Sequence, residues 1–110
     1  MDSSMNVTEL LEHFDRISSE ARVLLARKNH DYAGPGGLSP FRNFTKCEDF
    51  GVTSTEKGII VRMIDKLSRL CTYTEATEMK VSDEKFEDTI VDMINYCVIL
   101  SAYLSKSNEE

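Results

Sequence analysis

The sequence has no excess of positive charge, no long apolar run and no paired cysteine motif. Its 110 residues carry 19 acidic and 13 basic side chains, for a formal net charge of -6, and so acidic a chain lacks the electrostatic surface of a general nucleic-acid binder. No stretch approaches the roughly 18 consecutive apolar residues of a membrane span, and the polar start lacks the regions of a signal peptide. We therefore expect a cytoplasmic protein that binds neither nucleic acid nor membrane.

Several motifs that would indicate a known chemistry are also missing. The three cysteines, at positions 47, 71 and 97, are odd in number and lack CxxC spacing, which disfavours a disulfide framework and a zinc site and predicts reduced thiols. The glycines at 34, 36 and 37 do not match the GxxxxGK[ST] pattern of a phosphate-binding loop. No Ser-His-Asp or Cys-His arrangement is suggested, although His30 lies close enough to the following loop to be a candidate ligand contact.

Apolar residues at steps of four and three predict a first helix from Asn6 to about Lys28, with Asn6 and Glu9 as its capping pair. The next segment, residues 29–51, contains a Gly and Pro cluster at 34–40 that breaks any regular element there. A structureless segment of this length is uncommon in a small domain and is usually functional or disordered. Because it also carries several aromatic residues, we predict a packed, ligand-proximal loop.

Two further helices are predicted after this loop. Thr53 and Glu56 form a capping box for the second helix. Its apolar face should contain Ile60, Met63, Ile64, Leu67, Leu70 and Cys71. A polar turn precedes the third helix, which has Ser82 as N-cap and ends at about Leu104, so that residues 105–110 form a frayed tail.

The predicted fold is all-α: one domain over residues 1–110, built as a small bundle of three main helices with a long Gly/Pro/aromatic loop between the first and the second. A chain of this size buries only about two thirds of its extended surface, so an isolated three-helix monomer would be marginal. We therefore expect a homo-oligomer. Since the second connection is short, the second and third helices should be antiparallel neighbours.

Each of these two helices carries a polar stripe beside its apolar face. On the second helix the stripe consists of Arg62, Asp65, Lys66, Arg69 and Tyr73. On the third helix the polar arc consists of Asp88, Asp92 and Asn95. Between antiparallel neighbours the two stripes can meet as one polar seam.

Three interpretations of the seam stay open. Its charged groups could pair with one another, as partly buried salt bridges that fix the helix register and add little net stability. The carboxylates at 65, 88 and 92, joined by Glu87, could hold Mg²⁺, which binds one or two carboxylates together with phosphate oxygens and water. The cations at 62, 66 and 69 could instead bind phosphate directly.

Three stretches together resemble the nucleotide modification associated domain 1 family, a group of small, mostly phage-encoded helical proteins: KNHDYAGPGGLSPFRNF, RMIDKLSRL and EDTIVDMINYCVIL. The resemblance covers residues 25–104. Its motifs fall on Lys28, Asp31, Tyr32, Asn43, Phe44, Asp65, Lys66, Arg69, Glu87, Asp88, Asp92, Asn95 and Tyr96. Ala33 stands where the family usually has Gly, and the Gly/Pro insertion that follows is longer.

More distantly, the chain resembles the all-α nucleotide pyrophosphohydrolases related to MazG and the dimeric dUTPases. Their Mg²⁺ is held by a Glu-x-x-Glu helix and a later Glu-x-x-x-Asp helix, and the third predicted helix imitates the later one. The second helix, however, offers Asp65 and Lys66 where two acidic residues would be expected. If the chain is an enzyme, the resemblance implies a Mg²⁺-dependent nucleotide pyrophosphohydrolase; the departure agrees with nucleotide binding without hydrolysis.

We therefore expect a nucleotide site between the second and third helices, closed by residues 29–51. The expected nucleotide contacts are Lys28, Asp31, Tyr32, Asn43, Phe44, Arg62, Lys66, Arg69 and Asn95. The expected ligands of Mg²⁺ are Asp65, Glu87, Asp88 and Asp92. Two alternatives stay open: a non-catalytic oligomer that sequesters a nucleotide-derived immune signal in the host cytoplasm, and a helical protein-protein adaptor whose seam is purely structural.

Overall fold

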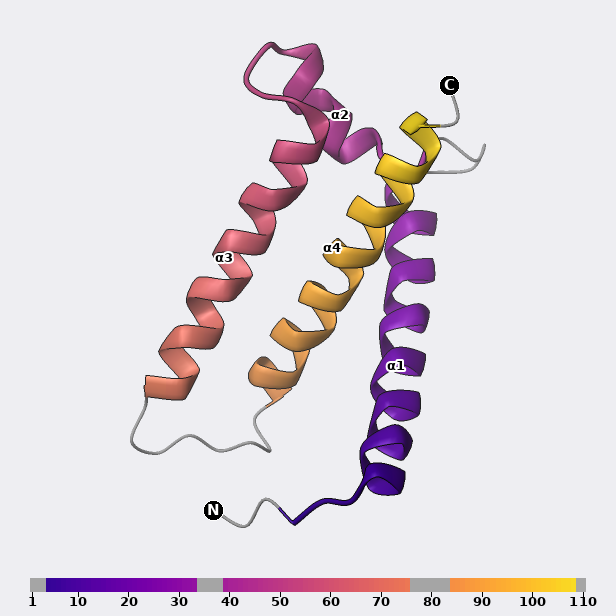
Figure 1. Cartoon of the computed structure of the whole chain (residues 1–110). Coiled ribbons are helices and arrows are strands. Elements are labelled where there is room, and N and C mark those ends of the chain that lie inside the picture. Colours follow the sequence, from indigo (N-terminus) through magenta and orange to yellow (C-terminus); the bar gives the residue numbers. More distant parts are fainter. Residues whose placement is uncertain (1–3, 34–38, 76–83, 109–110) are drawn as a thin grey trace.

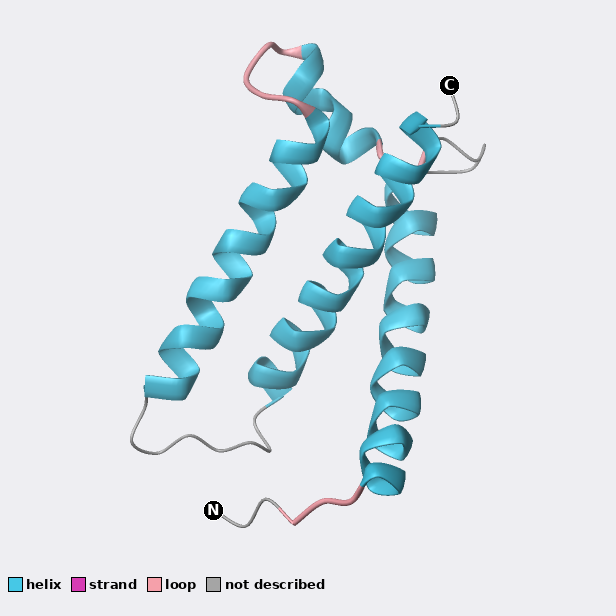
Figure 2. Cartoon of the chain, in the orientation of Figure 1, coloured by secondary structure: helices cyan, strands magenta, loops and turns pink. Residues whose placement is uncertain are grey.

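The computed structural model describes residues 4–33, 39–75 and 84–108, with the side chains of residues 30–33, 84 and 108 left out. Within these ranges the chain is all-helical (Figures 1 and 2). The helices are α1 (Val7–Ala33), α2 (Arg42–Asp49), α3 (Thr55–Glu75) and α4 (Glu84–Asn108). The all-α fold is confirmed, but the expected number of three main helices omitted α2. None of the described helices is long and apolar enough to cross a membrane.

Helix α4 lies between α1 and α3, running parallel to α1 and antiparallel to α3 (Figure 1). The predicted antiparallel pairing of the second and third main helices is thus confirmed. Ile17 and Ala21 of α1 pack with Val91 of α4 in a small apolar core. Asn95 of α4 donates a buried hydrogen bond of 3.1 Å to the carbonyl of Ala21, which fixes the register of the two parallel helices.

Helix α2 lies inside the segment that the sequence predicted to be a loop. It makes only two turns, too few for helical periodicity to stand out among the neighbouring Gly and Pro residues. Phe44 is its buried residue, and Phe41, just before it, contacts the ring of Tyr103 edge-on at 5.3 Å between centroids. The predicted packing of the aromatic residues is confirmed for these two, whereas Phe50 is exposed. Gly51 ends the helix with a φ of 73°, a backbone conformation that favours glycine.

The helix ends differ from the predicted ones by several residues. Asn6 and Glu9 cap α1 reciprocally, as predicted, but α1 continues to Ala33 and α4 to Asn108. The N-cap of α3 is Ser54 rather than Thr53, since the Ser54 hydroxyl accepts a 3.3 Å hydrogen bond from the backbone N–H of Lys57. The predicted N-cap Ser82 lies outside the described residues.

The larger error concerns the rotation of α3. Ile59, Met63, Lys66, Leu70 and Tyr73 share one face of α3 and are all buried or half-buried. Tyr73 meets Phe86 edge-on at 5.6 Å between ring centroids, and Lys66 reaches Asp92. Of the predicted apolar face, the side chains that remain exposed are Ile60, Ile64, Leu67 and Cys71. Contacts with α4 thus favour a mixed face of α3 over its most apolar one.

Gly58 offers a test of the contact between α2 and α3. A Cβ atom at this position would lie 3.4 Å from Cys47 Sγ and 3.8 Å from the Phe44 carbonyl oxygen. These are ordinary contact distances, and Ala favours a helix over Gly by about 1 kcal/mol. We expect Gly58→Ala to raise the free energy of unfolding by up to about 1 kcal/mol, and Gly58→Leu to lower it by displacing α2. Urea unfolding of both variants measures the effect; a less stable Gly58→Ala would contradict the packing described.

Candidate functional site

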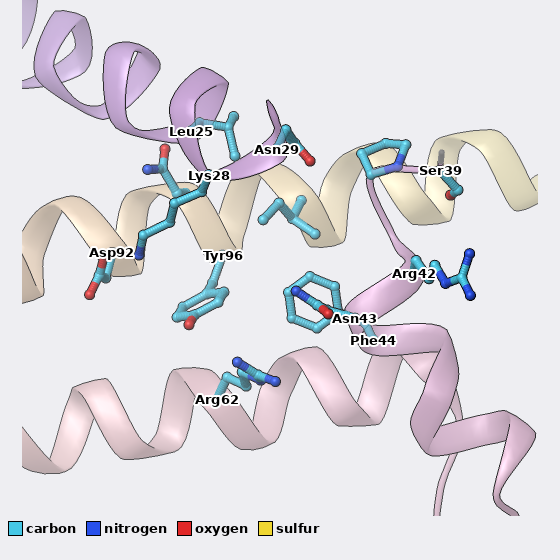
Figure 3. Close-up of a pocket in the computed structure, with 13 residues that line it drawn as sticks. Leu25, Lys28, Asn29, Ser39, Arg42, Asn43, Phe44, Arg62, Asp92 and Tyr96 are labelled. Carbon is cyan, nitrogen blue, oxygen red and sulfur yellow. Dashed lines mark hydrogen bonds and ion pairs between the residues drawn. The ribbon is translucent and has the colours of Figure 1, made fainter. Parts of the chain in front are cut away.

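A pocket of about 300 Å³ opens between the helices at the end where α2 lies (Figure 3). All four helices contribute to it. Its lining residues are Leu25, Lys28, Asn29, Ser39, Pro40, Arg42, Asn43, Phe44, Arg62, Asp92, Asn95, Tyr96 and Ile99. Apolar walls with a few polar groups at this volume are typical of small-molecule sites.

Asp92 of α4 sits between two lysines. Its Oδ2 atom lies 2.9 Å from Lys66 Nζ of α3, and its Oδ1 atom lies 3.3 Å from Lys28 Nζ of α1. The side chains of Asp92 and Lys66 are each only 17% exposed, so water screens this pair less than a surface pair. One carboxylate thus joins three helices, and the pairing across the seam is the one that the first interpretation predicts.

Arg62 of α3 forms a second wall of the pocket. Its guanidinium carbon lies 5.3 Å from the centroid of the Phe44 ring, a cation–π contact. Phe44 in turn meets the Tyr96 ring edge-on at 6.2 Å between centroids. In Figure 3 the Arg62 side chain rises from α3 toward Tyr96 and Asn43. The aromatic pair thereby holds the arginine head beside the pocket.

The lining carries more positive than negative charge. Lys28, Arg42 and Arg62 stand against the single carboxylate Asp92. Within the described part of the chain neither arginine pairs with a carboxylate, and Arg42 lies at the edge of the pocket with its side chain directed away from the other labelled residues (Figure 3). In a chain of net charge -6, this local surplus of cations favours an anionic guest.

The pocket brings together many of the residues that the sequence singled out: Lys28, Asn43, Phe44, Arg62, Asp92 and Asn95. Lys66 reaches it through Asp92. Arg69 is not part of the lining; its Nε atom lies 3.4 Å from Asp65 Oδ2, and both side chains are about three-fifths exposed (59% and 61%). Asp31 and Tyr32 lie on the last turn of α1, but their side chains, like that of His30, are outside the described residues.

The four predicted metal ligands do not converge. Asp65 pairs with Arg69 on the surface. Glu87 lies 2.7 Å from Arg16 of α1. The hydrogen bonds that Arg16 donates to Glu87, and then to Glu20, raise the pKa of Arg16. Asp88 borders a shallow hollow between α1 and α4, away from the pocket.

Only Asp92 of these four lines the pocket. Over the described ranges no three Asp, Glu, His or Cys side chains come close enough to hold a metal ion. On α4, the neighbours Glu87 and Asp88 point about 100° apart, and α3 turns Asp65 outward, where it pairs with Arg69. In the described structure these four carboxylates lie apart from one another, and a Mg²⁺ site stays a prediction.

Seven lining residues were not among the assigned contacts: Leu25, Asn29, Ser39, Pro40, Arg42, Tyr96 and Ile99. Arg42 directly precedes Asn43, and the unpredicted helix α2 carries both of them. Tyr96 directly follows Asn95 in a stretch that the sequence had marked without giving it a role. Had the sequence predicted α2, Arg42 would have been a candidate contact, because it lies beside Asn43 on that helix. Nothing in the sequence marks Asn29 as a contact.

No protein-family model, curated protein or solved structure matches this chain. The resemblance to phage nucleotide proteins therefore stays a prediction. The charges and the shape of the pocket are the features that indicate what it can bind.

A double-mutant cycle on Lys66 and Asp92 measures the ion pair at the base of the pocket. We expect Lys66→Met and Asp92→Asn each to lower the free energy of unfolding by about 1–3 kcal/mol, because each leaves a half-buried charge with fewer partners. The double variant should lose less than the sum of the two. The exposed pair Asp65 and Arg69 is the control, with an expected coupling below about 0.5 kcal/mol; equal coupling for both pairs would contradict the role given to burial.

Proposed function

We propose that this protein binds a nucleotide, or another small molecule with a phosphate group, in the pocket between the four helices. The observation that carries the proposal is the surplus of cations there: Lys28 and Arg62 line the pocket, and no described carboxylate pairs with Arg62. A guanidinium binds phosphate through a planar pair of N–H donors, and a lysine adds a point charge. Arg62 and Lys28 stand on opposite walls, so one phosphate chain could contact both.

The remainder of the lining suits the other parts of a nucleotide. Tyr96, Phe44 and Ile99 supply apolar and aromatic surface, and Asn43 supplies an amide donor and acceptor. Asn95 is partly committed, since its amide nitrogen already donates to the Ala21 carbonyl. In this proposal Asn95 therefore positions α1 against α4 more than it contacts the ligand.

The proposal favours binding without turnover. A hydrolase of this kind needs a carboxylate that is free to orient water or a metal ion. Asp92, the one described carboxylate of the lining, is balanced by two lysines. This supports sequestration of a nucleotide-derived signal by a phage protein over the Mg²⁺-dependent pyrophosphohydrolase.

Thermal shift across nucleoside triphosphates, cyclic nucleotides and inorganic phosphate tests the proposal, because a ligand of the folded state raises the melting temperature by mass action. Arg62→Ala should weaken binding by about 10- to 100-fold, as expected for a lost charge-assisted hydrogen bond. Arg27→Ala is the control, since it removes the same charge one residue before Lys28 but outside the pocket. If no phosphate compound raises the melting temperature of the wild type, the proposal fails and the adaptor alternative stands.

Arg69→Ala tests whether phosphate is bound only in the pocket or along the whole polar stripe of α3. With Arg69 in its surface pair with Asp65, we expect nearly wild-type affinity in this variant. A loss as large as that of Arg62→Ala would extend the phosphate contact along α3, as the sequence predicted.

Asp92→Asn tests whether Mg²⁺ takes part. Without metal, loss of the carboxylate frees Lys28 and Lys66 to contact phosphate, so the affinity for a nucleotide should rise several-fold. If Mg²⁺ instead bridges Asp92 to the phosphate, the affinity gained on adding Mg²⁺ should disappear in the variant. Titration calorimetry in EDTA and in MgCl₂ measures both effects. A lower affinity in EDTA would show that Asp92 itself contacts the ligand.

Whether the protein hydrolyses the nucleotide is tested by analysing the nucleotide after incubation. After incubation with Mg²⁺ and heat denaturation, we expect chromatography to recover the bound nucleotide intact. Released pyrophosphate or monophosphate would instead identify a hydrolase and contradict the sequestering form of the proposal.

A further inference from the structure

Helix α3 presents an apolar stripe that no other described helix covers. Ile60, Ile64 and Leu67 follow one another at steps of four and three, and Cys71 continues the series. Ile64 is 59% exposed and Leu67 is 53% exposed. On an α-helix this spacing places all four side chains on one face, as in the seam of a coiled coil. That face lies about a quarter turn from the one that packs on α4.

The chain as a whole exposes more surface than a compact monomer. Its accessible surface is 8384 Å², whereas a folded monomer of this mass exposes about 6,200 Å². Its radius of gyration is 16.4 Å, against about 13 Å for a compact chain of this length. The excess of about 2,200 Å² is well above the roughly 800 Å² that each partner buries in a standard protein–protein interface. This excess belongs to the whole chain, and the exposed stripe of α3 is one part of it.

We propose that a second copy of this chain covers the stripe, by antiparallel packing of α3 on α3 about a two-fold axis. A stripe of this kind is self-complementary, since the same residues of both copies interdigitate. The axis passes between Ile64 and Leu67, so that Ile64 of one copy lies against Leu67 of the other.

Charge decides the direction of the packing. Lys57 and Glu75 lie on α3 at nearly equal distances before and after the centre of the stripe, and both are exposed. Antiparallel helices bring Lys57 of one copy to the Glu75 end of the other, where the helix dipole also favours a cation. Parallel helices would instead place Lys57 against Lys57, a like-charge contact at the seam.

Light scattering and sedimentation on the full chain without ligand test the proposal. We expect the wild type to be a dimer at micromolar concentration, and Ile64→Glu and Leu67→Glu each to raise the dimer dissociation constant at least 10-fold. Val23→Glu is the control, because Val23 on α1 is as exposed (56%) but lies off the stripe, and it should remain dimeric. A monomeric wild type, or dimers unaffected by both stripe substitutions, would overturn the proposal.

Two further measurements give a readout other than loss of the dimer. The chain has no tryptophan, so Leu67→Trp introduces a single reporter whose emission should be blue-shifted in the dimer and shift to the red on dilution. Emission typical of an exposed indole at all concentrations would overturn the proposal. Lys57→Glu and Glu75→Lys should each weaken the dimer, and their combination should restore it. Failure of the combination to restore it would overturn the antiparallel packing.

Discussion

The arrangement of this molecule depends on one carboxylate held by two lysines. Asp92 of α4 reaches Lys66 on one flanking helix and Lys28 on the other, so a single ionic cluster connects the three long helices. A lone charge at this depth would lose hydration without compensation. Because two lysines surround one carboxylate, the cluster has a net positive charge. The pocket that it borders therefore carries surplus positive charge.

The same contact explains the exposed apolar surface. To present Lys66 to Asp92 and Tyr73 to Phe86, α3 turns a mixed face toward α4. Its most apolar stripe, with Ile64 and Leu67, then has to face outward. The pocket and the stripe are thus two consequences of one rotation: the side of α3 that carries Arg62 borders the pocket, and the opposite flank leaves Ile64 and Leu67 exposed.

Helix α2 completes the pocket and was the hardest element to predict. Residues near Gly and Pro give weak local signals, and two turns offer no periodicity. Its position is fixed by distant contacts, such as Phe44 with Tyr96 and Phe41 with Tyr103. Without α2, sequence reasoning could name Asn43 and Phe44 from a resemblance but could not give Arg42 a place.

By itself, the sequence determined the all-α class, the three long helices, the capping of α1 and the antiparallel pairing of α3 with α4. These depend on periodicity, capping and connection length, which act over a few neighbouring residues. Only the tertiary structure decided which face of α3 is buried, which carboxylate lines the pocket and which ones pair elsewhere. Those outcomes depend on how whole helices rotate against one another, and a rotation of about 100° is enough to exchange a buried charge for an exposed isoleucine.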